Sequence, residues 1–227
     1  MKALIYKELK LSMHPICYVF IFLFPLMILI PSYPLGIGFI YVLTCYPILF
    51  LGANKGQQSN DLLYSTLLPV RKKDIVLARI FTVIIMQVVF ILVMTALYPV
   101  ARIINNAIAQ SAEKPSEYMI PGLGLNSYVL LLGIAIIGYA IADLIFFPIY
   151  YKHGKSIVMS TLFTILGFVV YIGVFTIGLP FIPGFGILNN LHLGIQFAIL
   201  AAAILISFAL HIIVYKVSAK RLEKVDF

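Results

Sequence analysis

Charged side chains are scarce in this sequence. Asp, Glu, Lys and Arg make up 11% of its 227 residues, whereas 63% are apolar or aromatic. Soluble domains carry roughly 25% charged residues, and the mean hydropathy here is +1.08. These charged residues are too few to cover the surface of a soluble domain. Most of the exterior must therefore face lipid. The composition therefore predicts an integral membrane protein with an all-α fold, because helices satisfy their own backbone hydrogen bonds in a bilayer.

Reactive and metal-binding residues are also sparse. The only cysteines, Cys17 and Cys45, lie inside apolar runs and show neither a metal-type spacing nor a disulfide framework. The sequence has no GxxxxGK[ST] phosphate-binding loop, no HExxH and no GxSxG motif. Its four histidines are scattered: His14, His153 and His192 at span edges and His211 in the last span. We therefore expect neither an enzyme nor a bound cofactor in this chain.

Nucleic-acid binding is not expected either, despite a formal net charge of +8. The basic residues lie in the gaps between apolar runs, which is how charge orients a membrane protein. Membrane lipids, through their anionic headgroups, are the expected partners of these charges.

The chain contains several apolar runs of about 20 residues, the length that crosses a bilayer. We therefore predict a single transmembrane domain over residues 1–227. The uncharged stretch 15–53 is too long for one helix and is broken by Pro31, Pro34 and Gly36. No cleavable signal is predicted at the charged start. The six predicted spans cover about residues 15–32, 35–53, 75–101, 127–148, 156–179 and 195–215.

The connections between these spans are strongly asymmetric in charge. Of the 16 Lys and Arg residues, all but Arg102 and Lys114 fall on one side of a six-span arrangement. Basic loops stay in the cytoplasm. Both termini are therefore predicted to be cytoplasmic.

The connection 54–74 has the features of a short amphipathic helix at the cytoplasmic face. Asn60 or Asp61 can cap it, Leu63 and Leu67 recur at i,i+4 on one side, and Pro69 ends it. Asp74 can then cap the following span. From the residues alone, this helix either docks on a partner or merely rests on the lipid.

A resemblance favours docking. The charged amphipathic start (residues 4–10), two spans and the segment after them resemble the permease subunits of ABC-2 type transporters, most closely the small bacterial phenol-soluble modulin exporter permeases. That family carries S-L-P-V-S-R-x-x-I-V-x-x-K after the second span. The match is specific over about the first 80 residues, with Arg71 in place of serine and Arg79 in place of lysine. The matching residues are Leu67-Leu68-Pro69-Val70-Arg71-Lys72-Lys73-Asp74-Ile75-Val76-Leu77-Ala78-Arg79.

The resemblance implies a coupling helix over residues 61–68 that docks on a separate ABC ATPase subunit, with ATP and Mg bound there. It also implies an interfacial helix over residues 2–13 beside the ATPase, a second permease copy (identical or different) and the bacterial cell membrane as location. The expected substrate is an amphipathic peptide, or else a lipid-like molecule or hydrophobic drug. The residues expected at the coupling site are Asp61, Leu62, Leu63, Tyr64, Leu67, Leu68, Pro69, Arg71, Lys72 and Lys73.

Two further segments leave alternatives open. The Pro- and Gly-rich connector 180–194 is either a re-entrant hairpin on the outer side, which the family commonly has at this position, or an interfacial loop. Asp143, the only acid within a span, either forms a structural ion pair with Arg79, Lys152 or Lys155 or serves a substrate or proton.

Two rival classes remain. A secondary transporter, or a lipid or drug efflux protein without an ATPase, needs intramembrane ionisable groups, and Asp143 is the only one predicted. An intramembrane enzyme needs a converging catalytic set, which the sequence does not contain. The sequence thus favours a permease that moves amphipathic substrates outward.

Overall fold

The computed structural model describes residues 2–13, 15–29, 46, 65, 67, 69–111, 128–153, 157–174 and 191–224. Within these ranges the chain is helical, without β-strands, so the predicted all-α fold is confirmed. The elements in chain order are α1 (Lys2–Lys7), η1 (Glu8–Ser12), α2 (Pro15–Leu23), η2 (Phe24–Leu29), α5 (Lys72–Ser111), α6 (Tyr128–His153), α7 (Ile157–Gly173) and α8 (Leu193–Glu223).

The N-terminal segment is bent sharply. The helix Lys2–Lys10 lies at 83° to Pro15–Leu26. Met13 has extended backbone angles and donates its N–H to the Glu8 carbonyl at 3.0 Å, which closes the π-helical segment η1. Pro15 then starts α2, at a position where its missing N–H costs nothing. This bend allows α1 to lie across the axis of α2, as an interfacial helix would.

The helix α5 is longer than the predicted span 75–101. Its 40 residues extend about 60 Å at 1.5 Å per residue, twice the roughly 30 Å hydrocarbon core. Arg102 lies inside this helix, and the first ten residues after the predicted span 75–101 are helical as well. Only Lys72–Ile104 meets the length and hydropathy of a span, so α5 extends beyond the lipid.

The last helix, α8, also extends beyond the predicted span 195–215 and continues to Glu223. Lys and Arg stabilise the last turns of a helix by facing its negative end, so the basic sequence after residue 215 extends the helix. The predicted span 127–148 likewise extends to His153 in α6, whereas the helix in the span 156–179 ends at Gly173 in α7.

Three described helices, α5, α6 and α8, are long and apolar enough to cross a membrane, or four if the bent N-terminal pair counts as one span. The helix α7 is apolar but shorter, at 17 residues. The predicted span 35–53 lies outside the described residues except for Tyr46, and so does the connector 180–194 except for its last four residues. The chain is therefore a multi-pass helical membrane protein.

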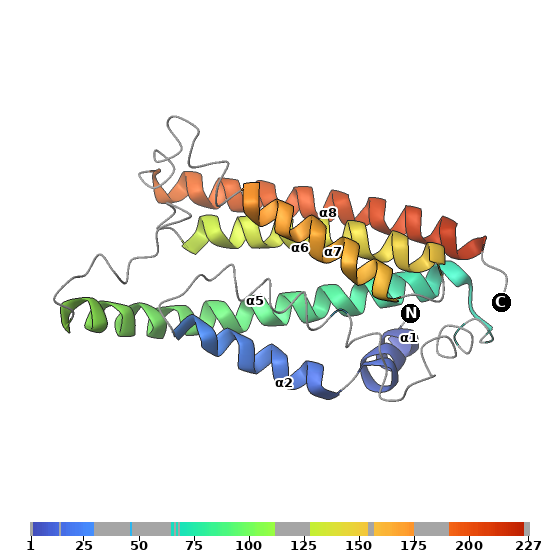
Figure 1. Cartoon of the computed structure of the whole chain (residues 1–227), viewed down its shortest axis with the longest axis horizontal. Helices are drawn as coiled ribbons and strands as arrows, with labels where there is room; N and C mark the ends of the chain where they lie inside the picture. The colour runs from blue at the N-terminus through green and yellow to red at the C-terminus, as the bar shows by residue number, and fades with distance from the viewer. Residues whose placement is uncertain are drawn as a thin grey trace.

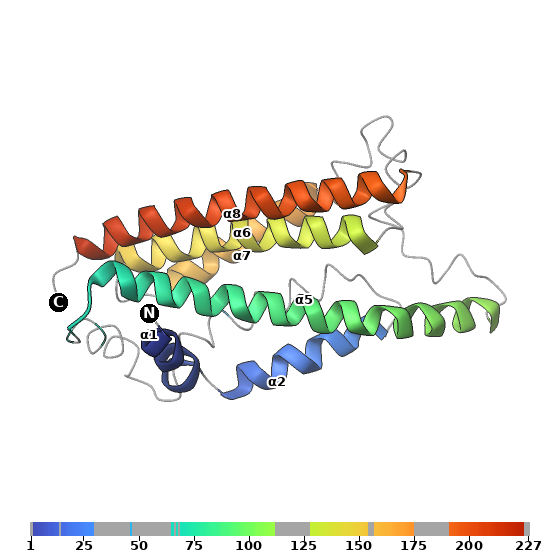
Figure 2. The same cartoon turned by 180° about the vertical axis from the view of Figure 1, so that it is seen from behind.

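The helices form two groups on either side of α5 (Figures 1 and 2). On one side α6 packs against both α7 and α8. On the other side α2 runs beside α5, and α1 contacts α5 near its start but lies across it. The helix α6 is the most enclosed of the three candidate spans, with 44% of its most apolar window buried against 11% for α8. Most of the surface of α8 is therefore free to face lipid or a partner.

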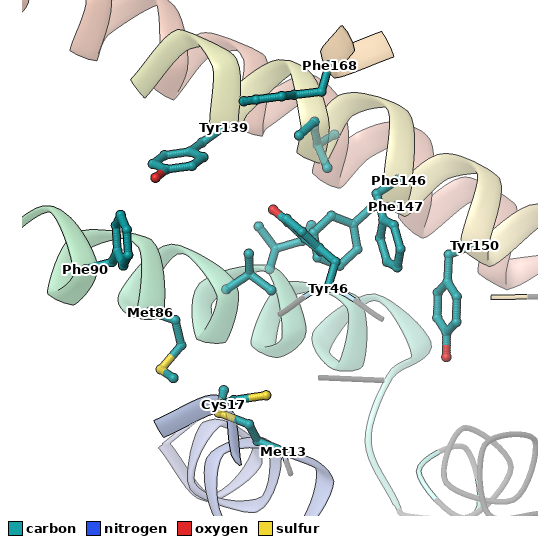
Figure 3. Close-up of a cluster of buried hydrophobic side chains, with 14 of the residues drawn as sticks. Met13, Cys17, Tyr46, Met86, Phe90, Tyr139, Phe146, Phe147, Tyr150 and Phe168 are labelled. Atoms are coloured by element: carbon teal, nitrogen blue, oxygen red, sulfur yellow. The ribbon is translucent and has the colours of Figure 1, made fainter. Parts of the chain in front are cut away.

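Large side chains fill the space between α5 and α6 (Figure 3). Phe146 and Phe147 of α6 are fully buried, and Phe146 packs its ring against Tyr46 at a centroid distance of 5.0 Å. On the opposite face of α5, Met86 points toward Met13 and Cys17 of the N-terminal segment. Cys17 is fully buried in this cluster.

The close approach of α6 and α7 depends on Gly138. A Cβ at this position would lie 2.9 Å from Cε1 of Tyr171, whose hydroxyl donates to the Ile134 carbonyl at 2.7 Å. Small residues allow membrane helices to approach this closely. Gly138→Ala is expected to lower the free energy of unfolding by about 1–3 kcal/mol, because the Tyr171 ring must move.

The measurement is unfolding of the purified protein in detergent. Gly173→Ala is the matched control, since a Cβ there meets nothing within 4 Å. Equal stabilities of the two variants would contradict the assignment of Gly138 to a packing role.

Candidate functional site

The predicted coupling site lies at the end of α5 where the chain enters from the connection 54–71. Asp61, Leu62, Leu63, Tyr64 and Leu68 lie outside the described residues. Ser65 and Leu67 are helical, Ser65 is fully buried, and Leu67 is 72% exposed. Leu67 is thus an apolar side chain presented outward from the described part of the predicted coupling helix.

The turn into α5 is held by Arg71. Its Nε donates to Oδ2 of Asp74 at 2.9 Å, and its carbonyl accepts the Asp74 N–H at 2.8 Å. The hydrogen bond to the Asp74 carboxylate raises the pKa of the Arg71 guanidinium above its usual value. Pro69 lies in the bend just before, and Lys72 and Lys73 form the first turn of α5. Asp74 lies in that same turn, where an acid opposes the positive helix end.

The N-terminal helix is attached to the same place by two polar contacts. Lys7 donates to the hydroxyl of Ser65. Next to it, Glu8 receives two hydrogen bonds from Arg79 of α5, from Nε at 2.9 Å and from Nη2 at 3.2 Å. Glu8 is 2% and Arg79 1% exposed, so this ion pair is buried. Arg79 also contacts the hydroxyl of Tyr150 at 3.3 Å, which ties α6 to the same cluster.

The predicted ion pair of Asp143 with Arg79 is therefore wrong, because the structure pairs each residue with a different partner. The N-terminal segment brings Glu8 against Arg79 of α5, and a prediction of spans alone could not reveal this contact. The sequence does contain an indication that Glu8 and Arg79 pair. Glu8 is the only acid before Asp61, and Arg79 stands isolated in an apolar run. Each of these charges needs a partner if it is buried.

Asp143 is the centre of a second polar cluster, between α5, α6 and α8. It is fully buried, and its Oδ2 lies 2.9 Å from Nε2 of His211. The same oxygen accepts from Nε2 of Gln87 at 3.1 Å, and that amide nitrogen also donates to the Tyr46 hydroxyl at 2.7 Å. His211, Gln87 and Tyr46 were missed at the sequence level. A signal for the Asp143–His211 contact does exist in the sequence, because Asp143 is the acid and His211 the histidine that lie within the last three predicted spans.

The hydrogen bonds define the charge of this cluster. Nδ1 of His211 lies 2.7 Å from the Ser207 carbonyl, which can only accept, so Nδ1 carries a hydrogen. The contact between Nε2 and Asp143 then requires one more hydrogen, on the ring or on the carboxyl group. In both cases Asp143 and His211 together carry no net charge, which lowers the cost of burying them.

The cluster lies at membrane depth. Gln87 is 15 residues from the start of α5, Asp143 is 10 from the end of α6, and His211 is 12 from the end of α8. At 1.5 Å per residue these offsets are about 15–22 Å from the basic ends of the helices. Among the described residues no three His, Cys, Asp or Glu side chains gather as metal ligands would. The cluster is thus an intramembrane hydrogen-bonded network.

These features define a multi-pass helical membrane protein whose N-terminal helix is held to the long helix α5 by a buried ion pair. A family model described as ABC-2 family transporter protein matches residues 3–220. The chain belongs to this family and is a transmembrane permease of an ABC transporter. No curated protein and no solved structure matches it. Permeases of the ABC-2 family generally work with an ABC ATPase subunit.

Proposed function

We propose that this chain is the permease half of an exporter that is driven by a separate ATPase subunit. The observation that carries the proposal is that the N-terminal segment contacts both Ser65 of the connection 54–74 and Arg79 near the start of α5. Lys7 binds Ser65, and Glu8 binds Arg79. A push on this surface would be transmitted directly to the first turns of α5, which continue without proline up to Pro99.

The proposed topology has the six predicted spans, in one transmembrane domain with both termini in the cytoplasm of a bacterial cell. The arrangement of the described helices supports it. The helix α1, the start of α5 and the end of α8 lie at the same end of the bundle (Figure 1). Lys72, Lys73, Lys216, Lys220 and Arg221 are at this end, as the positive-inside rule requires of a cytoplasmic face.

In the proposed cycle, ATP and Mg bind the partner ATPase, and its closure displaces the coupling helix 61–68 together with α5. Two permease copies, identical or different, enclose the transport path. The substrate is an amphipathic molecule, with short peptides as the leading class, because the described helices offer apolar and aromatic surfaces and few charges. ATP hydrolysis is assigned to the partner chain.

The direct test is co-purification of this permease with an ABC ATPase subunit. Leu63→Asp combined with Leu67→Asp is expected to reduce the amount of bound ATPase at least tenfold, because two charges would enter an apolar contact. Ile103→Asp is the matched control, since Ile103 is similarly exposed at 70% but lies on the far part of α5. If the ATPase still binds the double variant, residues 61–68 are not the coupling helix.

One observation favours a second candidate, gradient-driven transport by this chain alone. The Asp143–His211 pair holds a hydrogen at membrane depth, and secondary transporters use such groups as proton relays. Uptake or efflux by vesicles that contain only this chain, driven by a pH gradient and without ATP, would establish the second candidate. Transport that requires both ATP and the ATPase would establish the first.

A further inference from the structure

A groove of about 500 Å³ runs between α5 and α8 over the intramembrane cluster. Its volume is in the range of ligand sites, which are mostly apolar with a few placed polar groups. The walls come from α5 and α8, and α6 contributes Ile136 and Tyr139. Several wall residues are also partly exposed at the surface of the bundle, so the groove is open sideways toward the bilayer: Phe81, Val88, Leu92, Ile204, Phe208 and Ile212.

Besides its apolar walls, the groove is lined by the polar side chains of Gln87, Ser207 and His211 and by two tyrosines, Tyr139 and Tyr215. The N–H groups of Gln87 and His211 are already used. The Gln87 amide nitrogen donates to Tyr46 and Asp143, and the two ring nitrogens of His211 contact the Ser207 carbonyl and Asp143. The Gln87 amide is oriented with its nitrogen toward Asp143, because the Asp143 oxygen accepts and so requires a donor opposite it. The carbonyl oxygen of Gln87 therefore points away from Asp143. The Ser207 hydroxyl can donate or accept, so it does not discriminate between ligands.

Two acceptor oxygens of the cluster are unfilled. The carbonyl oxygen of Gln87 accepts no hydrogen bond in the structure as described, and Oδ1 of the fully buried Asp143 has no partner. Gln87 lines the groove, and Asp143 lies behind His211. Unfilled acceptors at membrane depth cost free energy. They favour a ligand that brings a hydrogen-bond donor, and more so a positively charged one.

We infer that this groove binds amphiphiles that carry a protonated amine, with the apolar tail between α5 and α8 and the N–H group on Gln87. The inference deepens the proposed function and rests on it for the role of the site, since an amine-bearing amphiphile would be the exported substrate. Cationic amphiphiles are preferred over anionic ones, because the N–H groups of Gln87 and His211 are already used and an anionic head would lie beside the unfilled acceptor of Gln87.

The site is tested by photoaffinity labelling of the purified chain in lipid nanodiscs. The probe is dodecylammonium with a diazirine in its chain, and the readout is the amount of label on peptides from α5 and α8. Matching probes carry a trimethylammonium or a sulfate head, which lack N–H donors. Loss of one charge-assisted hydrogen bond corresponds to about a tenfold change in binding. We therefore expect the primary ammonium probe to label the groove at least tenfold more than either of the others.

Two variants distinguish labelling inside the groove from labelling of the neighbouring surface of α8. Ile204→Trp fills the groove and is expected to reduce labelling about tenfold, whereas Leu205→Trp is expected to leave it unchanged. Leu205 is 69% exposed and does not line the groove. Equal labelling by the three probes, or full labelling of Ile204→Trp, would overturn the inference. Cross-linking of Ile204→Cys to a second copy would also overturn it, because the groove would then be a contact between permeases.

The labelling experiment tests the binding site separately from the exporter proposal, because labelling requires no ATPase. Selective labelling without ATP-driven transport would retain the site and remove the exporter proposal. ATP-driven transport of a peptide without selective labelling would retain the exporter and remove the site.

Discussion

Replacing Arg79 by methionine is expected to lower the free energy of unfolding by about 3–5 kcal/mol, which is typical for breaking a buried ion pair from one side. Arg79 and Glu8 are 1% and 2% exposed. Removing the guanidinium leaves the Glu8 carboxylate buried. Among the described residues its remaining cationic neighbour is Lys7, whose Nζ lies 3.5 Å from Oε1 of Glu8. The measurement is thermal or denaturant unfolding of the purified chain in detergent.

The double variant Glu8→Leu/Arg79→Met is the decisive control. It removes both buried charges and leaves only the partly exposed Lys7 without its contact to Glu8, so it is expected to recover most of the lost stability. Arg71→Met removes a guanidinium from an exposed pair with Asp74, where Arg71 is 73% exposed, and is expected to change stability little. Equal losses for Arg71→Met and Arg79→Met would contradict the burial of the Glu8–Arg79 pair.

The same pair has an expected functional effect. If Glu8 and Arg79 transmit the movement of the ATPase, the double variant folds and binds the ATPase but transports less substrate per ATP hydrolysed. The readout is the ratio of transport to hydrolysis in reconstituted vesicles. An unchanged ratio would restrict the pair to a structural role.

The second large effect is expected for His211→Ala, about 3 kcal/mol of lost stability or more. Without the imidazole, Asp143 must either remain charged with Gln87 as its donor or take up a proton, and both cost free energy in a fully buried site. Adding Asp143→Asn to His211→Ala removes the charge and is expected to recover most of the loss.

His192→Ala is the matched control for His211→Ala. His192 accepts from the Gly194 N–H at the exposed start of α8, and the loss of such a cap costs about 1 kcal/mol. Asp143→Asn alone separates the two roles considered for Asp143. Lowered stability with unchanged transport would contradict a role for Asp143 in substrate or proton handling.

Several features of the fold could be predicted from the sequence because they depend on one chain segment at a time. The positions of α5, α6 and α8 follow from runs of about 20 apolar residues. The family match over residues 3–220 agrees with the family inferred from the segment 67–79. The helix ends were less predictable. Lys216 and Arg102 marked boundaries in the hydropathy pattern, but both residues favour or tolerate helix and are helical in the structure.

The candidate site was predicted less well, because its contacts join distant segments. Glu8 and Arg79 are 71 residues apart, and Asp143 and His211 are 68 apart. Periodicity places a residue on a helix face but does not state which helix lies opposite. Arg79 was therefore assigned to Asp143, although the bend after η1 brings Glu8 to it first.

The sequence by itself determined that this protein lies in a membrane and belongs to the ABC-2 permeases, because scarcity of charge and a local motif need no tertiary information. Only the tertiary structure decided the partner of each buried charge. A buried ion must be compensated within a few ångströms, and the packing of α5 against the N-terminal helix, α6 and α8 decides which groups come that close. The same packing leaves the groove beside Gln87 and His211, which no single segment of the sequence encodes.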